Sequence, residues 1–430
     1  MAKPPDPKVD PARAAALRLL GEVTEHGRTL AEAMPKVLAS LAPADRARAQ
    51  RIATGTLRWT DRADRMLGPF LRMKPRPGIH NLLRMALYEI HVDGGAAHGV
   101  VSAAVDLAAT LPQGASQAGL VNGVLRNVAR QGPGAWDTLP LPRLPKWLRK
   151  PLVADYGKAV VADMEAAFAA PPPLDLSVKD DAEGWARRLG GQVLPTGGVR
   201  LGTPGQVSRL DGFEAGAWWV QDAAAAVPAH VLAPRPGERV LDLCAAPGGK
   251  TMQLALSGAE VTALDLSAAR MARVEENLAR VGLSARIEVG NALAFRTGAP
   301  FDAVLLDAPC TATGTLRRHP DLPHARTPDG FPEIFALQAR LIDAALDLVR
   351  PGGRVVFCTC SLLFDEGEEQ VRDAMERHPG LVADPAPLAL PGIDPAWIGP
   401  EGGLRLRPDY WPELGGMDGF YVASLRRPPG

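Results

Sequence analysis

The stretch VLDLCAAPGGKT, residues 240–251, decides how the second half of this chain folds. Its apolar run Val240–Leu243 predicts a strand, and Gly248 and Gly249 stand where the chain must turn sharply from that strand into a helix. Such a turn presents backbone N–H groups to a ligand. The stretch therefore predicts a ligand site at the carboxyl end of a strand in an α/β domain.

Downstream of this stretch, short apolar runs alternate with amphipathic helical segments. The runs expected to be strands are Val240–Leu243, Val261–Leu264, Ile287–Val289, Phe301–Leu306 and Arg354–Phe357. Regular alternation of strand and helix is typical of parallel βαβ units. It predicts a doubly wound, Rossmann-like sheet from about residue 220 onward.

Three side chains at predicted strand ends indicate which ligand the Gly-Gly turn binds. Asp265 ends the second strand, where a carboxylate accepts the hydrogen bonds of a ribose diol. Asn291 follows the third strand, where its amide is placed to address an adenine edge, although a simple turn asparagine explains it equally. Asp307 ends the fourth. Neither G-x-G-x-x-G nor the NTPase phosphate loop occurs here, so an adenosine cofactor recognised without its phosphates fits best; a plain βα turn is the alternative.

The first part of the chain has a different texture. From residue 12 to about 130, apolar residues recur at helical spacing, as in Leu19, Leu20 and Val23, and predict an all-α bundle. Residues 131–150 are rich in Pro, Gly and basic residues, which suits a linker, and residues 151–210 suggest a small α/β insert. The expected domains are 10–135, 145–212 and 213–428.

Charge is distributed unevenly between these parts. Residues 1–150 hold 22 Lys and Arg against 12 Asp and Glu, which leaves 26 against 36 in the rest, although the whole chain is neutral. A basic module beside an acidic one suits a polyanion-binding arm on an enzyme, and solubility alone is the competing explanation. The imbalance favours nucleic acid as the partner.

Composition narrows the setting. With 46% hydrophobic and 22% charged residues the chain has the make-up of an ordinary globular protein, and no apolar run approaches the ~20 residues of a membrane helix. The start MAKPPDPKVD lacks the apolar core of a signal peptide. Four cysteines without a C-x-x-C pair suggest neither a disulfide framework nor a zinc site. We expect a cytoplasmic protein with no metal, no membrane association and no obligate protein partner.

Two thiols stand at equivalent places in the predicted sheet. The fourth strand leads into Asp307-Ala308-Pro309-Cys310 and the fifth into Cys358-Thr359-Cys360, so both thiols can face one pocket. A single buried cysteine is usually an inert small hydrophobe. A pair at adjacent strand ends, one beside a carboxylate, favours chemistry instead. The residues alone do not say which thiol attacks a substrate.

The segments LDLCAAPGGKT, DAPCTATGTLRRHPD, CTCSLLFDEGE and DGFYVASL resemble the NOL1/NOP2/Sun family of RNA cytosine-5 methyltransferases. The resemblance spans residues 210–427, and its paired DAPC and TCS motifs are highly specific. Residues 12–130, with RIATGTLRW, LLRMALYEI and GLVNGVLRNVAR, resemble the NusB-type RNA-binding domain. That fusion is characteristic of members that modify small-subunit ribosomal RNA. It implies a NusB-like bundle joined to a class I methyltransferase domain.

The resemblance also implies roles for individual residues. It assigns Cys360 as the nucleophile that bonds to the cytosine, Cys310 as the residue that assists product release, and Asp307 to the site. S-adenosylmethionine is the implied cofactor, and the implied cofactor-binding residues are Cys244, Ala245, Ala246, Pro247, Gly248, Gly249, Lys250, Asp265, Asn291 and Asp307. Asn291 stands where many members carry Asp, and Cys358 is expected to be a plain strand residue.

Alternatives remain at this point. The chain is also compatible with a non-catalytic RNA-binding assembly factor, or with a methyltransferase acting on amides or exocyclic amines, although such enzymes typically carry N/D-P-P-Y/F where Cys310 lies. Basic residues at 317–319 are candidates to hold a phosphate, against a solvated loop. In the bundle, Arg51, Arg58, Arg62 and Arg65 are candidates for RNA backbone contacts, against a charged helix face.

Overall fold

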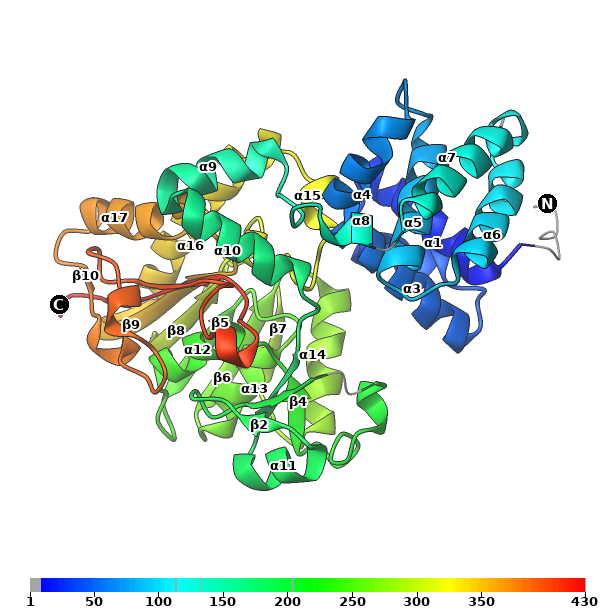
Figure 1. Cartoon of the computed structure of the whole chain (residues 1–430). Helices are drawn as coiled ribbons and strands as arrows, with labels where there is room; N and C mark the ends of the chain where they lie inside the picture. The colour runs from blue at the N-terminus through cyan, green and yellow to red at the C-terminus, as the bar shows by residue number, and fades with distance from the viewer. Residues whose placement is uncertain (1–8, 113, 133, 203–204, 430) are drawn as a thin grey trace. The chain divides into compact units, whose positions relative to one another are not determined.

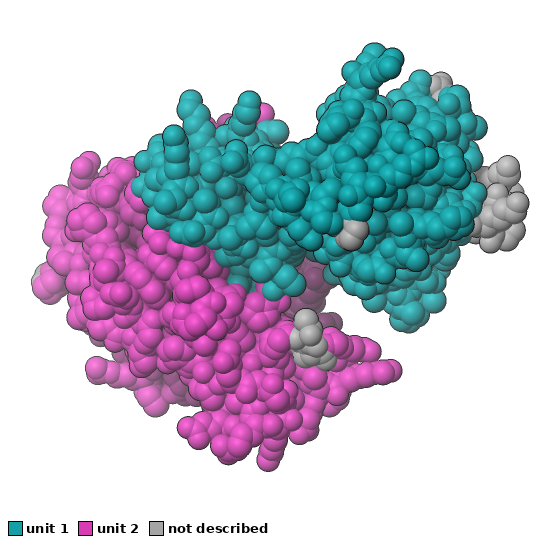
Figure 2. Space-filling view, in the orientation of Figure 1, with its two compact units in different colours: residues 1–171, 316–328 teal, residues 172–315, 329–430 magenta. Residues whose placement is uncertain are grey.

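The computed structural model describes residues 9–112, 114–132, 134–202 and 205–429. The chain forms two compact units: residues 1–171 with 316–328, and residues 172–315 with 329–430 (Figure 2). The finer division into three domains stays a prediction, and most of the signal-peptide expectation falls on residues 1–8, outside the described part. Within the described ranges, no helix is both long and apolar enough to cross a membrane.

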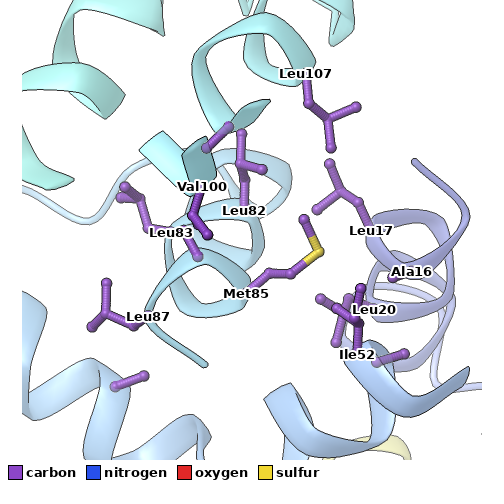
Figure 3. Close-up of a cluster of buried hydrophobic side chains, with 14 of the residues drawn as sticks. Ala16, Leu17, Leu20, Ile52, Leu82, Leu83, Met85, Leu87, Val100 and Leu107 are labelled. Carbon is purple, nitrogen blue, oxygen red and sulfur yellow. The ribbon is translucent and has the colours of Figure 1, made fainter. Parts of the chain in front are cut away.

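The first unit is helical, as the apolar periodicity predicts. Its helices are α1 (Pro11–Thr24), α2 (Leu30–Val37), α3 (Pro43–Arg58), α4 (Thr60–Leu67), α5 (Pro77–His91), α6 (Ala97–Thr110), α7 (Ala118–Arg130), α8 (Gly134–Asp137), α9 (Lys146–Tyr156), α10 (Lys158–Ala169) and α15 (Leu322–Ala325). A capping box starts α2, where Thr29 and Glu32 exchange side-chain and backbone hydrogen bonds. The apolar stripes meet in one core, in which Met85 of α5 lies beside Leu17 and Leu20 of α1 (Figure 3).

Two of the arginines proposed for RNA backbone contacts instead hold the chain together. The Arg58 guanidinium donates to the carbonyl oxygens of Phe168 (2.7 Å) and Arg317 (2.6 Å), and burial lowers the pKa of Arg58 to about 10. Arg62 donates to the carbonyl of Leu139 and lies over two tryptophan rings. The other two candidates form ion pairs, Arg51 with Asp93 and Arg65 with Asp61. None of the four is a free cation on a helix face.

Residues 316–328 fold with the helices although they lie far downstream in the sequence. The Asp321 carboxylate accepts the backbone N–H of Leu30, 2.8 Å away, at the first turn of α2. The His324 ring lies 3.2 Å from the carbonyl oxygen of Leu57. A carboxylate at a helix N-terminus compensates unpaired N–H groups and the positive end of the helix dipole. These contacts explain why the segment belongs to the helical unit.

The second unit begins with a four-stranded antiparallel sheet in the order β2-β3-β1-β4. Its elements are β1 (Leu174–Val178), α11 (Ala182–Leu189), β2 (Gln192–Val193), β3 (Val199–Leu201) and β4 (Trp218–Val220). Asp175 and Arg200 form a bidentate ion pair at 2.7 and 2.6 Å, with side chains 1% and 2% exposed. Arg200 also donates to the carbonyl oxygens of Leu414 and Gly416, so this pair fastens the small sheet to the end of the chain.

The larger sheet has eight strands and confirms the predicted alternation. Strands and helices follow as α12 (Ala223–Leu232), β5 (Arg239–Leu243), α13 (Gly249–Leu256), β6 (Glu260–Asp265), α14 (Ala268–Arg280), β7 (Arg286–Val289), β8 (Phe301–Asp307), α16 (Phe331–Leu348), β9 (Val349–Thr359), α17 (Glu368–Arg377), β10 (Val382–Ala383), β11 (Leu404–Leu406) and β12 (Phe420–Arg426). The order is β10-β12-β9-β8-β5-β6-β7, with β11 pairing to β12.

All five strands named from the sequence pair in parallel, in the order β9-β8-β5-β6-β7. The antiparallel edge formed by β10, β11 and β12 was not anticipated, so the sheet is mixed. Helices α16 and α17 cover one face, whereas α12, α13 and α14 cover the other (Figure 1). Burial on both faces explains why the parallel strands read as continuous apolar runs.

Candidate functional site

The two thiols meet just beyond the carboxyl ends of β8 and β9. These strands are adjacent and parallel, with Asp307 in register with Cys358. Beyond the last strand residues, Asp307 and Thr359, the chain delivers Cys310 and Cys360, whose Sγ atoms are 3.4 Å apart. The structure therefore brings together the two cysteines that strand geometry predicted to share a pocket.

Asp307 faces the same place and is paired. Its Oδ2 accepts a hydrogen bond from the Lys250 ammonium at 2.8 Å, and its Oδ1 lies 3.5 Å from the buried Cys358 thiol. Burial lowers the pKa of Lys250, but the Asp307 carboxylate outweighs it and the net shift is upward. Lys250 also lies 5.0 Å from the Phe420 ring. The Lys250 ammonium is thus bound to Asp307. A contact between Lys250 and a cofactor stays a prediction.

The turn after β5 has an unusual backbone. Cys244 has a φ of +62° and Gly248 a φ of +102°, and a Cβ on Gly248 would come within 3.1 Å of Val274. Ala245 and Ala246 are buried, Pro247 is exposed, and Gly249 opens α13. A side chain at position 248 would be both strained and crowded. The glycine is therefore required for the turn that leads into α13.

Asp265 ends β6 and is buried, with 4% of its surface exposed. Its carboxylate accepts the backbone N–H groups of Ser267 (3.0 Å) and Ala246 (3.3 Å), which links the two strand-end turns. The next residue, Leu266, is 75% exposed. A large apolar side chain left in the open beside a carboxylate suits the flat face of a base next to its ribose. Leu266 gives no signal in the sequence, because a single leucine after a strand forms no pattern.

Acidic groups gather around the turn. Burial raises the pKa of Asp242 to about 7, with Thr251 donating to one of its oxygens at 2.6 Å. Among the described residues, the other oxygen, Oδ1, is buried without a hydrogen-bond partner. Burial, then the charges of Asp307 and Asp265, raise the pKa of Cys244 to about 12. Two of these acidic groups have a cation beside them, because Lys250 pairs with Asp307 and Arg270 lies 3.5 Å from Asp265.

Asn291 is exposed, and its side-chain oxygen accepts the backbone N–H of Leu293 at 3.0 Å. This local hydrogen bond is typical of a turn asparagine. The side-chain oxygen of Asn291 is therefore occupied within the turn. The hydrogen bond to Leu293 also fixes the orientation of the side-chain NH₂ group. A contact with adenine stays a prediction.

Two further polar residues that sequence analysis did not single out surround Cys310. Glu366 and Gln338 are each 0% exposed and hydrogen-bond to each other at 3.0 Å. Glu366 lies within the quoted CTCSLLFDEGE segment, but nothing in the sequence marks this glutamate as buried.

Arg317, which was a candidate to bind a phosphate, is 1% exposed. It therefore does not lie on a solvated loop and does not present its guanidinium to solvent. Within the described ranges no group of His, Cys, Asp and Glu is arranged to hold a metal ion.

Comparison with known proteins identifies the family. The family model described as 16S rRNA methyltransferase RsmB/F matches residues 229–426, and the NusB family model matches residues 10–130. Ribosomal RNA small subunit methyltransferase B of Erwinia tasmaniensis is 33% identical over 97% of this chain and 99% of that protein. The chain belongs to the RsmB/F methyltransferase family. The helical first unit accordingly contains a NusB domain at residues 10–130, and the second carries a class I methyltransferase domain.

Solved structures agree with this fold. The crystal structure of PH0851 covers 96% of this chain and 99% of its own, with a TM-score of 0.72 and 24% identity. The structure of NSun6 from Pyrococcus horikoshii with SFG, an S-adenosylmethionine analogue, covers 66% of this chain and 98% of its own, with a TM-score of 0.57 and 22% identity. At these identities the likeness shows the fold.

The RsmB/F family uses S-adenosylmethionine, and the geometry of this chain fits that cofactor. The cofactor carries a positive sulfonium and an α-ammonium, and the carboxylates Asp265 and Asp307 at the strand ends are acceptors for such groups. The N-terminus of α13 offers N–H groups for the cofactor carboxylate. Asp265 and the exposed Leu266 suit the ribose and adenine. The site thus offers carboxylate acceptors to the cationic groups of the cofactor and N–H donors to its carboxylate.

Proposed function

We propose that this protein methylates carbon 5 of a cytosine in RNA, most directly 16S ribosomal RNA, through a covalent bond between Cys360 and the base. The single observation that carries the proposal is the pair of thiols 3.4 Å apart at the ends of adjacent strands, beside the Asp307 carboxylate. Carbon 5 of cytosine is a weak nucleophile. A thiolate added at carbon 6 makes carbon 5 electron-rich, and covalent catalysis thereby divides one difficult step into two.

Attack begins with the Cys360 thiolate forming a sulfur–carbon bond at carbon 6. Asp307 accepts a hydrogen bond from the exocyclic amino group. The proton that leaves the Cys360 thiol reaches N3 through solvent as negative charge develops on the ring, and the carboxylate accepts the resulting N3–H. Lys250 keeps the Asp307 carboxylate oriented by its 2.8 Å bond. When bound, the cofactor would supply an electrophilic methyl group: carbon 5 would bond to it with its own electron pair, and the sulfur–methyl bond would break to leave S-adenosylhomocysteine. The base must leave its stack to reach these residues, so the substrate is single-stranded or flipped RNA.

Release requires removal of the carbon 5 proton and then cleavage of the bond from sulfur to carbon 6. The hydrogen bond with Cys360, then burial, raise the pKa of the Cys310 thiol above its ordinary value. Two thiols in contact share one proton far more easily than they lose two. Once Cys360 is bonded to the base, its hydrogen bond to Cys310 is gone and the main cause of the raised pKa disappears. Cys360 leaves the shared proton on Cys310 when it attacks, so Cys310 passes that proton to solvent and, as the thiolate, takes the carbon 5 proton.

The cofactor is held by the turn and the strand ends around it. Ala245, Ala246, Pro247, Gly248 and Gly249 supply backbone groups, in line with the positive φ of Gly248 and the opening of α13. Cys244 lies at the start of this turn. Asp265 takes the ribose hydroxyls, and Asn291 offers its amide hydrogens to the adenine.

The uneven charge of the sequence supports the NusB domain as the part that binds RNA. The four free thiols suit a reducing cytoplasm.

Two single substitutions test the covalent mechanism. Cys360→Ser replaces the thiol by a hydroxyl too weakly acidic to ionise, so neither methylated RNA nor a covalent adduct is expected. Cys310→Ala leaves attack and methyl transfer in place, so the protein is expected to accumulate on RNA as a band resistant to denaturing gels. The double variant is expected to lose that band. Tritiated S-adenosylmethionine and a 16S rRNA transcript provide both readouts.

Each alternative has a distinct result. An adduct in Cys360→Ser that vanishes in Cys310→Ala would reverse the two roles. Full activity in both variants would exclude a covalent mechanism. Nucleoside mass spectrometry of RNA from a deletion strain identifies the product: loss of 5-methylcytidine supports the proposal, loss of a methylated amine assigns another substrate, and no loss leaves an assembly factor.

A further inference from the structure

A buried carboxylate with no part in the chemistry above lies directly behind the Cys310 loop. Glu366 is fully buried in the short helix Phe364–Glu366, and its Oε1 accepts the backbone N–H of Thr311 at 2.9 Å. Its Oε2 accepts the Thr311 hydroxyl. In the described part of the chain no cation pairs with this carboxylate. A buried carboxyl group is costly unless it is hydrogen-bonded, so the position of the Glu366 side chain depends on these donors.

Gln338 of α16 completes the arrangement from the other side. Its buried amide donates to Oε1 of Glu366 at 3.0 Å and to the carbonyl oxygen of Pro309 at 2.8 Å. The peptide carbonyl before Cys310 and the peptide N–H after it are therefore both fixed to one buried pair. Strand pairing ends before this point, because the register of β8 with β9 stops at Asp307. The position of Cys310 depends on these side chains rather than on the sheet.

The nucleophile loop is held by separate contacts. Ser361 accepts at its carbonyl from the Arg405 guanidinium, which is itself paired with Glu368. Gly314 donates its N–H to the Cys360 carbonyl at 2.9 Å. Within the described residues, the Glu366 carboxylate bonds to Thr311 and Gln338 and not to the chain around Cys360. The Thr311 hydroxyl also lies 3.2 Å from the Ser361 hydroxyl beside Cys360, so loss of the Glu366 carboxylate acts first on the Cys310 loop and reaches the Cys360 loop only through that contact.

We propose that Glu366 is the positioning residue for Cys310: through Thr311 and Gln338 it holds the thiol where it takes the carbon 5 proton, so its loss slows release of the methylated RNA while attack by Cys360 continues. This inference rests on the covalent mechanism proposed above. A displacement of about 1 Å at a reacting group costs up to ~100-fold in rate. We expect release to slow by roughly 10- to 100-fold.

The experiment uses the full chain, a 16S rRNA transcript and tritiated S-adenosylmethionine. Glu366→Ala is compared with Glu366→Gln, which keeps an acceptor for the Thr311 N–H, and with Cys310→Ala as the reference for blocked release. Glu369→Ala is the matched control, because Glu369 lies three residues on and pairs with Arg372 on the surface of α17. Rates of adduct formation and of methylated RNA release are measured separately, with thermal melting alongside.

The expected result is an adduct that forms at nearly the normal rate and accumulates in Glu366→Ala, partial rescue in Glu366→Gln, and normal turnover in Glu369→Ala. A uniform loss of attack and release, or unchanged release, would overturn the inference. If Glu366→Ala does not fold, Gln338→Met removes the bond to Pro309 and takes its place under the same criteria. If even Cys310→Ala accumulates no adduct, the covalent mechanism fails first. If Cys310→Ala accumulates it and Glu366→Ala does not, the inference about Glu366 alone fails.

Discussion

Asp265→Ala is expected to weaken binding of S-adenosylmethionine severely. The carboxylate is 4% exposed and ends β6 beside the Gly248 turn, where it would accept both hydroxyls of the ribose. A hydrogen bond to a charged group contributes about 1.5–3 kcal/mol, so loss of two costs roughly 3–6 kcal/mol. That free energy corresponds to a dissociation constant higher by about 150- to 25,000-fold. Asp265→Asn keeps one acceptor oxygen and loses the charge, so a smaller loss of roughly 5- to 30-fold is expected.

Isothermal titration calorimetry measures the affinity, and circular dichroism with thermal melting checks the fold, because Asp265 also accepts the N–H groups of Ala246 and Ser267. Asp302→Ala is the matched control, because Asp302 lies near the amino end of β8, away from the carboxyl ends of the strands. The Asp302→Ala variant should bind the cofactor normally. An unchanged dissociation constant in folded Asp265→Ala would remove Asp265 from the cofactor site and refute the reasoning from strand ends.

Three further predictions follow from single features. The pKa of Cys244 is raised from 9.0 to about 12, so its thiol form persists to high pH. Iodoacetamide at pH 8 should therefore alkylate Cys244 roughly a thousand times more slowly than a free thiol. Mass spectrometry follows the alkylation rate against pH, and a midpoint of that rate curve near pH 9 would contradict the prediction. Asp175→Ala leaves Arg200 buried and unpaired at a cost of about 3–5 kcal/mol, so calorimetry should show a melting temperature lower by ~6–20 °C, and a drop under 2 °C would refute it. Arg126→Gln with Arg130→Gln removes two exposed cations from α7 and should lower the salt slope of RNA binding by up to about 2; an unchanged slope would exclude that face.

Local patterns were enough to predict the parallel strands that build the site, although not the antiparallel edge. The runs Val240–Leu243 and Phe301–Leu306 are strands because most of their residues are apolar and suit burial on both faces, and the carboxyl ends of parallel strands lie at one edge of the sheet. The meeting of Cys310 and Cys360 follows from this rule and is confirmed at 3.4 Å. Short motifs predict well where one residue's place depends on its immediate neighbours.

Contacts between distant segments were not predictable in this way. Lys250 belongs to the same motif as Gly249, yet its side chain turns to Asp307, 57 residues later. Arg58 has the look of a helix-surface cation, but the carbonyl groups it binds lie 110 and 259 residues away. A charged residue gives the same sequence signal whether it faces solvent or satisfies buried carbonyl oxygens. The difference appears only when the fold brings those oxygens to it.

The loop that carries Cys310 illustrates why such contacts matter to function. Residues 308–315 have little regular structure, so their backbone groups are not fixed by a strand or helix ladder. Glu366 and Gln338 bind the peptide groups flanking Cys310. The peptide groups on either side of Cys310 are therefore held by buried side chains from elsewhere in the sequence. A thiol that must wait for its partner to react before it takes a proton needs a backbone that stays in place, and these anchors supply it without a regular ladder.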